Sequence, residues 1–590
     1  MLRIKGFVEV EPPPLPLDQR SFAIFLLISR PPLLARRGND CRRVANELLA
    51  QDPPTASPTA SDTLPPLGYS NSPMTRSVVR TRFAPSPTGF LHIGSVRTAF
   101  FNWLYARKHG GQYLLRIDDT DQQRNVAEAL VPIFNGFRWL GLTWDEGAEV
   151  GGPNGPYYQS QKLPRYQEAA RAILDKGLAY LDYASEEEMK AERQAAEQAK
   201  RPFQYSRRWM AESASDRARF EGEGRKGVVR LKMPREGKCV FNDHVRGRVE
   251  VEWTQEADHV IQRADGSALY NLANVVDDYD MKISHVMRSA EHLSNTPRQI
   301  FIAQALGYPL PEYAHFPVVA EPGSKNKLSK RKIADYLKNP DFRKLYEHGE
   351  RIAKALGITT NAETFNPVIT DFYERVGYLP EAILNYIVLL GWSFDDKTEF
   401  FTTQELIDAF SLERINKAPA SFDAKKLLAF QERYMNLKPL DEKVAMCRPY
   451  LQQPGFATDR LADVIQAAAD RIKIAGDILD YAAFFLPAER LTYDEDAYDK
   501  RVRTPAEASG LLKKFASILE SLEPFDAPTI EKALQDFVKN EGIGHAQIIH
   551  ALRIAITGKT VGFGLFESLA ILGRAECLVR IERALARLSG

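Results

Sequence analysis

The chain has 590 residues, of which 44% are hydrophobic and 26% charged, so most of it is expected to fold, as roughly three to five domains. A formal net charge of +1 excludes a strong overall attraction to nucleic acid, so any contact with RNA has to use local patches. The cysteines are scattered, at Cys41, Cys239, Cys447 and Cys577, with no metal-ligand spacing. This pattern indicates a reducing compartment and argues against a zinc site.

Residues 1–73 are rich in proline and show no sustained period. Their apolar burst, Phe22 to Ile28, is far shorter than the about 20 residues needed to span a bilayer. We interpret 1–73 as a disordered leader or as the product of a start codon placed too early, with Met74 as the true start. A targeting segment is the alternative.

From residue 78 the pattern becomes that of an α/β protein. Residues 78–84 and 113–117 give strand signals, and 94–106 between them has helical spacing. This order predicts a right-handed crossover in a parallel sheet. Ligands of such sheets bind beyond the carboxyl ends of the strands, where the loop 85–95 and residues 118–121 are expected.

Two loops have the chemistry of an anion site. Gly89 and Gly94 allow the backbone to approach a ligand closely, and the following helix points its N-terminal amides at an anion. His92 would lie among these amides, although a lone His-x-Gly is more often an ordinary surface turn. The second loop, 327–331 (KLSKR), is cationic, but charge runs are usually solvated faces.

The run 82–95, RFAPSPTGFLHIGS, closely resembles the opening signature of glutamyl-tRNA synthetases, which belong to class I of the aminoacyl-tRNA synthetases. The order Lys-Leu-Ser-Lys at 327–330 is similar to the Lys-Met-Ser-Lys loop of that class. Further matching segments are LRIDDTD (115–121), WLGLTWDEG (139–147), YNLANVVDD (270–278), NTPRQ (295–299), GYLPEAILNY (377–386), LRIAITG (552–558) and GLFESLAILG (564–573).

The resemblance implies an α/β fold with a class I Rossmann-like nucleotide-binding domain. An inserted acceptor-stem domain, a stem-contact region and an all-α anticodon-binding domain are expected with it. The expected divisions are 74–185 and 269–325 for the two halves of the catalytic domain, 186–268 for the insertion, 326–420 for the Lys-rich loop and stem-contact region, and 421–590 for the helical anticodon-binding domain.

The resemblance also implies the reaction of a glutamate–tRNA ligase. The glutamate carboxylate attacks the α-phosphorus of ATP to give glutamyl-adenylate and pyrophosphate, and glutamate then passes to the terminal adenosine of tRNA(Glu). His92, Lys327 and Lys330 are the expected catalytic residues, which stabilise phosphate charge with Mg²⁺. The expected ATP-binding residues are Pro85, Thr88, Gly89, His92, Gly94, Glu291, Lys327, Ser329, Lys330 and Arg331.

Glutamate carries a side-chain carboxylate and an α-ammonium, so its site needs fixed cations and an anion. Arg82 and Arg288 match the family's carboxylate-recognising arginines, and Asp118 the acid that meets the ammonium. An isolated arginine at a strand end would more often make a surface ion pair. The expected hydrogen-bonding partners are Ser86, Tyr270 and Asn274.

The chain departs from the family pattern at several positions. Ser95 stands where the class signature ends in histidine, and Asp118 is shorter than the usual glutamate. Residues 289–292 read SAEH, with Ala290, where many relatives have Gly-Glu-Asp-His. Residues 180–185 lack the cysteines that hold zinc in some relatives, so no zinc is expected. Ser95 and Ala290 motivate the alternative of a non-enzymatic paralogue.

The segment 200–248 has 14 Lys/Arg and 6 Asp/Glu, a local excess of 8 positive charges that suits tRNA phosphates. A charged helix, 186–200, precedes it, and a long connection, 339–375, has no functional assignment. Beyond residue 406 helical spacing dominates, as in 425–434 and 577–586. A cytoplasmic monomer without a membrane partner is expected, and an enzyme that also charges tRNA(Gln) is the alternative.

Overall fold

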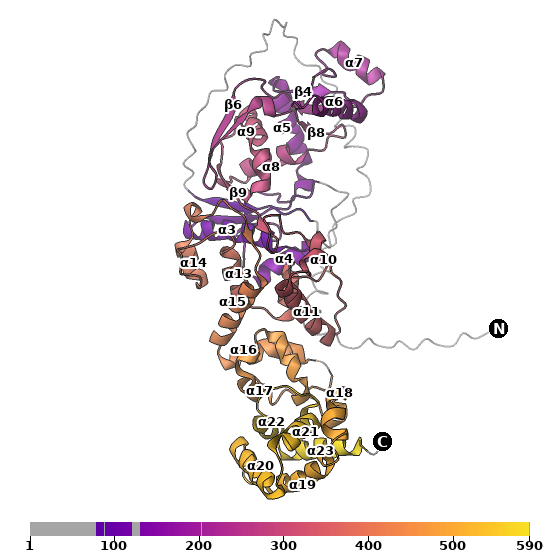
Figure 1. The fold of residues 1–590 in the computed structure, drawn as a ribbon. Helices are drawn as coiled ribbons and strands as arrows, with labels where there is room; N and C mark the ends of the chain where they lie inside the picture. The colour runs from indigo at the N-terminus through magenta and orange to yellow at the C-terminus, as the bar shows by residue number, and fades with distance from the viewer. Residues whose placement is uncertain (1–77, 88, 121–129, 202, 453, 589–590) are drawn as a thin grey trace, which may run out of the picture.

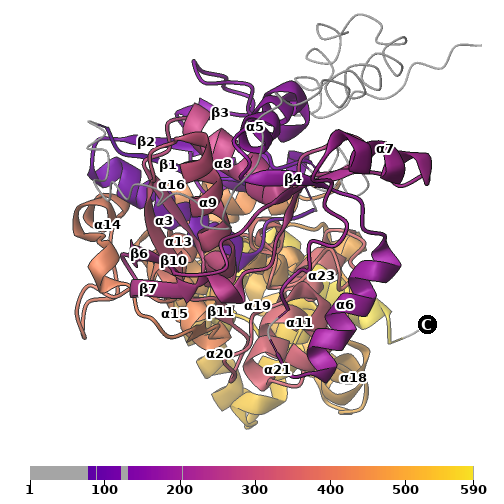
Figure 2. The same cartoon turned by 90° about the horizontal axis from the view of Figure 1, so that it is seen from above.

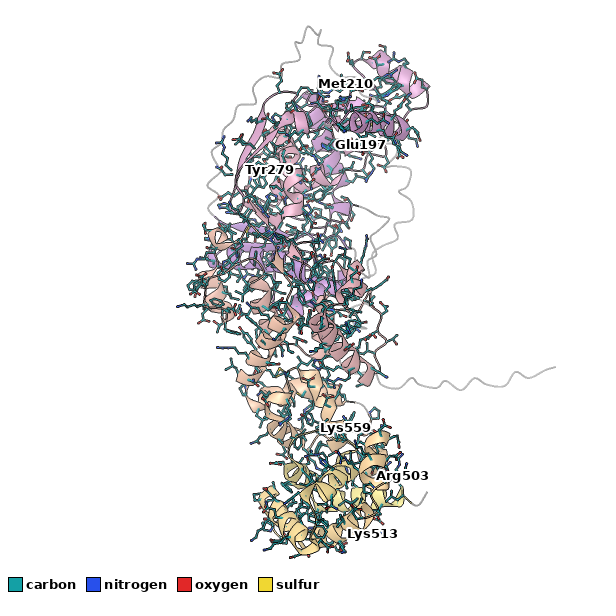
Figure 3. All side chains as sticks on the ribbon, viewed as in Figure 1. Glu197, Met210, Tyr279, Arg503, Lys513 and Lys559 are labelled. Carbon is teal, nitrogen blue, oxygen red and sulfur yellow. The ribbon has the colours of Figure 1, made fainter. Side chains whose placement is uncertain are left out.

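The computed structural model describes residues 78–87, 89–120, 130–201, 203–452 and 454–588. The interpretations of 1–73 and Met74, and the ATP-binding prediction for Thr88, lie outside these residues. None of the described helices is both long and apolar enough to cross a membrane. The molecule is elongated, with Glu197 and Met210 toward one end and Lys513 and Arg503 toward the other (Figure 3).

The predicted strand–helix–strand unit is present. Strand β1 (Arg80–Phe83) leads through helix α3 (Ile93–Lys108) to β2 (Gln112–Leu115). β1 and β2 pair in parallel, as predicted, and β3 (Glu146–Gly147) adds to the far side of β2. Helix α4 (Leu130–Trp139) follows β2 in the chain. The apolar positions of α3 are buried because the helix lies against the sheet on one side and against α13 (Pro380–Val388) and α14 (Thr403–Ala409) on the other.

A second sheet continues the first. Its order is β7 (Gly247–Glu252), β6 (Lys238–Asp243), β10 (Glu312–Phe316) and β9 (His285–Ser289), with β9 and β10 parallel. The Ser284 amide donates to the carbonyl of Arg80 at 3.0 Å, which joins this sheet to β1. One core is shared by α5 (Leu163–Asp175), α8 (Tyr270–Asp280) and α9 (Thr296–Leu306).

The expected insertion 186–268 does not coincide with one structural unit. β4 (Ala179–Asp182), before it, pairs with β5 (Val228–Leu231), within it, and β5 pairs with β8 (Val260–Gln262). β6 and β7, also within it, join β10 instead. Strand pairing between distant segments thus crosses the boundaries that the family resemblance implies. Helices α6 (Glu186–Gln198) and α7 (Ala214–Gly222) project to one side of the β1–β3 sheet (Figure 2).

The connection 339–375 is largely helical. It forms α11 (Pro340–Ala355) and the start of α12 (Thr370–Val376), after a single turn, α10 (Ile333–Tyr336). Helix α15 (Ala424–Leu437) follows, and β11 (Val319–Ala320) pairs with β12 (Ala420–Ser421). These elements share a core with α3; Phe342 on α11 and Phe101 on α3, for example, both belong to it.

The C-terminal region is helical, as predicted (Figure 1). It has its own hydrophobic core. β12 is a two-residue exception beyond residue 406. The helices are α16 (Leu440–Cys447), α17 (Leu461–Ala468), α18 (Glu495–Tyr498), α19 (Ala508–Ser521), α20 (Ala527–Glu541), α21 (His545–Thr557), α22 (Leu565–Leu572) and α23 (Arg574–Ala586).

Candidate active site

A cavity of about 300 Å³ opens where β1 and β9 end and the Lys-rich loop begins. Most of the predicted ATP and glutamate residues line it. They are Arg82, Pro85, Ser86, Gly89, His92, Gly94, Asp118, Tyr270, Asn274, Arg288, Glu291 and Lys327. Ser329, Lys330 and Arg331 are not on its wall. The Nζ of Lys330 nevertheless reaches the first loop, since it would lie 3.6 Å from a Cβ placed on Gly89.

His92 is held at the start of α3. It is the N-cap residue, and its Nδ1 accepts a hydrogen bond from the Ser95 amide at 3.3 Å. Nε2 therefore carries the proton of the neutral ring and faces Ser95 Oγ at 2.8 Å. Burial and the nearby Lys327, with Lys330, lower the pKa of His92 to about 4, although Glu291 opposes them. At neutral pH the imidazole is thus an uncharged donor.

Gly94 leaves the space that the His92 ring occupies. A Cβ at Gly94 would lie 3.2 Å from His92 Cε1, tighter than ordinary contacts. Gly89 adopts φ +113°, a backbone conformation that glycine favours. Both positions therefore favour glycine for local reasons, while the close approach of the backbone to a ligand stays a prediction.

The connection 339–375 anchors the His92 loop. The Ile93 amide donates to the carbonyl of Val368 at 3.0 Å. The amide and the hydroxyl of Thr370 both donate to the carbonyl of Leu91, each at 3.0 Å. No role for this connection could be assigned from the sequence, because backbone pairing over such a separation leaves no periodic signal.

The Lys-rich loop is fixed on one side and open on the other. Leu328 is buried and its amide donates to the carbonyl of Val319 at 2.9 Å, while the Ser329 amide donates to the Tyr336 hydroxyl at 3.0 Å. Lys327 Nζ pairs with Glu291 Oε2 at 2.7 Å, with both side chains nearly half exposed. Burial works to raise the pKa of Glu291, but Lys327 holds it below its usual range. Such an exposed pair is weak enough to exchange for a phosphate.

Arg82 belongs to a buried charge network that the sequence analysis missed. Its Nε and Nη2 each lie 3.1 Å from an oxygen of Asp278. Arg116 bonds the same carboxylate at 2.6 Å and donates to Asp118 Oδ1 at 2.8 Å. A charged Arg116 between two apolar residues next to a buried strand is the signal that could have revealed this network.

The two acids of this network have opposite pKa shifts. Burial raises the pKa of Asp118 to about 6, against the pull of Arg116. At Asp278 burial also acts to raise the pKa, but Arg82 and Arg116 together hold it below its usual value. Asp118 is therefore the carboxylate that can still gain from a new positive partner.

Arg288 has an unused donor. Its Nε donates to His315 Nε2 at 3.1 Å and its Nη2 to Thr296 Oγ1 at 3.0 Å, while Nη1 is buried without an acceptor. His315 Nδ1 in turn lies 2.6 Å from Asp243 Oδ2. Burial lowers the pKa of Arg288. Because an unpaired buried donor is costly and the Arg288 residue lines the cavity, an anionic ligand is favoured beside it. His315 and Asp243 had no sequence signal.

Residues 78–356 and 365–429 match the family model of the tRNA synthetases class I (E and Q), catalytic domain. The chain belongs to this synthetase family. Residues 442–585 of the synthetase match the anticodon binding domain model.

Similar curated synthetases are named glutamate–tRNA ligases. That of Moorella thermoacetica is 41% identical over 514 residues, which cover 86% of this chain and 98% of the relative. That of Caldanaerobacter subterraneus subsp. tengcongensis is 40% identical with the same coverage. A crystal structure of a glutamate tRNA ligase from Elizabethkingia meningosepticum in complex with its amino acid matches with TM-score 0.71 and 30% identity, covering 86% of this chain and 99% of that one.

Part of the basic excess at 200–248 of the synthetase is offset internally. Arg225 pairs with Glu188, Arg230 with Asp182 and Arg207 with Asp258. All three acids lie outside the segment. Exposed cations such as Lys200, Arg201 and Lys226 remain on this surface. The positive charge that residues 200–248 can offer to a polyanion is therefore smaller than the excess of 8 counted from the sequence.

Proposed function

We propose that the protein is a glutamate–tRNA ligase. It activates L-glutamate with ATP to glutamyl-adenylate, releases pyrophosphate, and transfers glutamate to the 3′-terminal adenosine of tRNA(Glu). The observation that carries the proposal is that Arg288, whose Nη1 is buried without an acceptor, lines the same cavity as His92 and Lys327. A side chain that can donate to a carboxylate and side chains that can donate to phosphates thus line one cavity.

In the first step the amino acid is held at both ends. Arg288 and Arg82 receive the side-chain carboxylate, and Asp118 receives the α-ammonium. Ser86, Tyr270 and Asn274 supply neutral hydrogen bonds. The α-carboxylate stays free to approach the α-phosphorus, and holding both reactants in one cavity lowers the entropic part of the barrier.

The phosphates are held at the other side of the cavity. A carboxylate oxygen forms a bond to the α-phosphorus while the bond from that phosphorus to the pyrophosphate oxygen breaks. His92 Nε2–H, Lys327 and Lys330 stabilise the negative charge that moves onto the leaving pyrophosphate. Lys327 exchanges Glu291 for phosphate in this step. No side-chain nucleophile is needed.

Mg²⁺ is expected with ATP, because it is commonly held by substrate phosphates and one or two carboxylates. Glu291 is a cavity carboxylate that fits this role once Lys327 has turned to phosphate. When bound, the ion would neutralise phosphate charge. Because residues 180–185 carry no cysteine, we expect no cysteine-held zinc there.

The second step joins the adenylate carbonyl to a ribose hydroxyl, expected to be the 2′-OH, with release of AMP. Exposed cations of 200–248 and the C-terminal helices are the expected tRNA contacts. We expect a monomer in the cytoplasm.

Lys330→Ala tests the proposal. Glutamate-dependent exchange of pyrophosphate into ATP, measured with tRNA present, should fall by about 10² to 10³, as for loss of one charge-stabilising donor. Affinity for tRNA(Glu) should stay the same. Lys338→Ala is the control, because Lys338 is exposed and pairs with Asp335 outside the cavity. Unchanged charging by Lys330→Ala would refute the mechanism, and parallel assays with tRNA(Gln) measure tRNA specificity.

A further inference from the structure

Three side chains able to bind a metal ion gather on the catalytic sheet, away from the cavity. His244, His285 and Glu312 each bring one ligand atom to within 4.8 Å of the others. His244 follows β6, His285 begins β9 and Glu312 begins β10. The cavity uses Arg288 and Ser289 at the other end of β9, roughly 10 Å further along the strand.

The backbone of the sheet fixes these positions. Glu312 stands directly opposite His285 in the parallel pair β9 and β10. The His244 amide donates to the carbonyl of Tyr313 at 2.9 Å, which holds the turn after β6 beside Glu312. Little ordering is therefore needed to bring the three side chains to one ligand, and the entropic cost of binding is small.

The His285 ring is oriented by its neighbour. Its Nδ1 lies 2.8 Å from Ser284 Oγ, and this hydroxyl donates to the carbonyl of Arg80 at 3.1 Å. Ser284 Oγ therefore accepts the Nδ1 proton, which makes Nε2 the acceptor nitrogen of the ring. A second partner that fixes the tautomer in this way is characteristic of metal-binding histidines.

Both imidazoles face the same carboxylate oxygen. Glu312 Oε2 lies 2.6 Å from His244 Nε2 and 3.5 Å from His285 Nε2. The Tyr105 hydroxyl lies 3.3 Å from the same His285 nitrogen. An ordinary surface hydrogen bond between His244 and Glu312 explains the position of the His244 ring. It does not explain why Nε2 of the buried His285, which accepts from the Tyr105 hydroxyl, also lies within reach of the same carboxylate oxygen.

We propose that His244, His285 and Glu312 bind a divalent transition-metal ion of the zinc class, with water completing its coordination. Two imidazole nitrogens and one carboxylate oxygen suit Zn²⁺, whereas Mg²⁺ and Ca²⁺ prefer oxygen ligands throughout. The site uses no cysteine, so the scattered cysteines, on which the expectation of no zinc rests, do not bear on it. The ion joins the β6–β7 hairpin to β9 and β10, a role separate from the proposed charging reaction.

Zinc titration of untagged, chelator-treated protein tests this site. In calorimetry with excess MgCl₂, we expect one Zn²⁺ per chain and a higher thermal midpoint in its presence. Co²⁺ should give the visible absorption of a low-coordinate site. His244→Ala and Glu312→Gln should each weaken zinc affinity by at least about tenfold. His550→Ala is the matched control, because His550 is an exposed histidine on α21, in the C-terminal region.

Absence of zinc binding by the unmodified chain would overturn the proposal. So would zinc affinity that survives both substitutions, or a zinc signal that excess Mg²⁺ removes. The substitutions are made at His244 and Glu312, the two more exposed positions, because replacement of the buried His285 can unfold the sheet edge. Glutamylation assays are independent of these measurements, so failure here leaves the proposed charging function in place.

Discussion

Ser95 Oγ lies 2.8 Å from His92 Nε2, while the Ser95 amide donates to the other nitrogen of the same ring. The residue that departs from the class signature therefore holds the signature histidine from both sides. Ser95 Oγ accepts the hydrogen bond from His92 Nε2–H, and a phosphate oxygen can take its place as acceptor. Its presence is compatible with catalysis and gives no support to a non-enzymatic paralogue.

Ser95→Ala should slow pyrophosphate exchange by about 2- to 13-fold, the equivalent of one net hydrogen bond. The effect should fall on the rate and on the KM for ATP, with the KM for glutamate unchanged, because only His92 loses a partner. Ser95→Thr should restore the rate. Ser517→Ala removes a hydroxyl that bonds only within α19 and should change nothing. Equal rates for the alanine and threonine variants would show that Ser95 does not position His92.

Glutamate affinity should fall as the pH drops through the raised pKa of Asp118, about 6. A carboxyl group with a raised pKa loses its charge as pH falls, and the α-ammonium then loses its partner. Between pH 7 and pH 5 the ionised fraction falls about tenfold, so Kd should rise about tenfold. Calorimetry with glutamate measures this. The Asp118→Asn variant should bind glutamate weakly, and its Kd should change little between pH 7 and pH 5. A Kd of the unmodified chain that does not change over this range would contradict the pairing of Asp118 with the α-ammonium.

Arg288→Lys should raise the KM for glutamate by at least about 30-fold, or about 2 kcal/mol. Lysine keeps the charge but cannot bond His315 and Thr296 while presenting a further donor to the ligand. The KM for ATP should change little. Arg298→Lys is the matched control, because Arg298 on α9 forms a partly buried pair with Glu256 outside the cavity wall. A similar KM for glutamate in both variants would remove Arg288 from the glutamate site.

The two main hydrophobic cores, one around α3 and one in the C-terminal helices, should unfold in separate steps. Phe515 is fully buried in the second core, 5.4 Å from Phe537 between ring centres. Phe515→Ala should cost about 3 to 5 kcal/mol and lower the transition of the C-terminal helices by about 10 °C, leaving the other in place. Differential scanning calorimetry measures both. Val561→Ala, at a side chain that is 76% exposed, is the control. A single transition that shifts as a whole would contradict separate cores.

The parallel pairing of β1 and β2 was predictable from local signals, whereas most residues of the cavity wall were named from the family resemblance. His92 and Lys327 come from short motifs, and the parallel pairing of β1 and β2 follows from strand and helix spacing. The partners of the arginines were not predictable. Arg82 meets Asp278 across 196 positions of sequence, and Arg288 is supported by His315 and Asp243 from two other strands. Such pairings depend on the register of distant strands, which a single sequence does not encode in a readable period.

The backbone hydrogen bond from Ile93 to Val368 has a consequence for the order of folding during synthesis of the chain. A chain grows from its N-terminus, and its early segments begin to fold first. The loop with His92 leaves the ribosome long before the backbone of Val368 and Thr370 that holds it. A nascent chain that ends before these residues carries the first signature without its anchor. The nucleotide site therefore matures late in synthesis, after the inserted strands and the Lys-rich loop have already emerged.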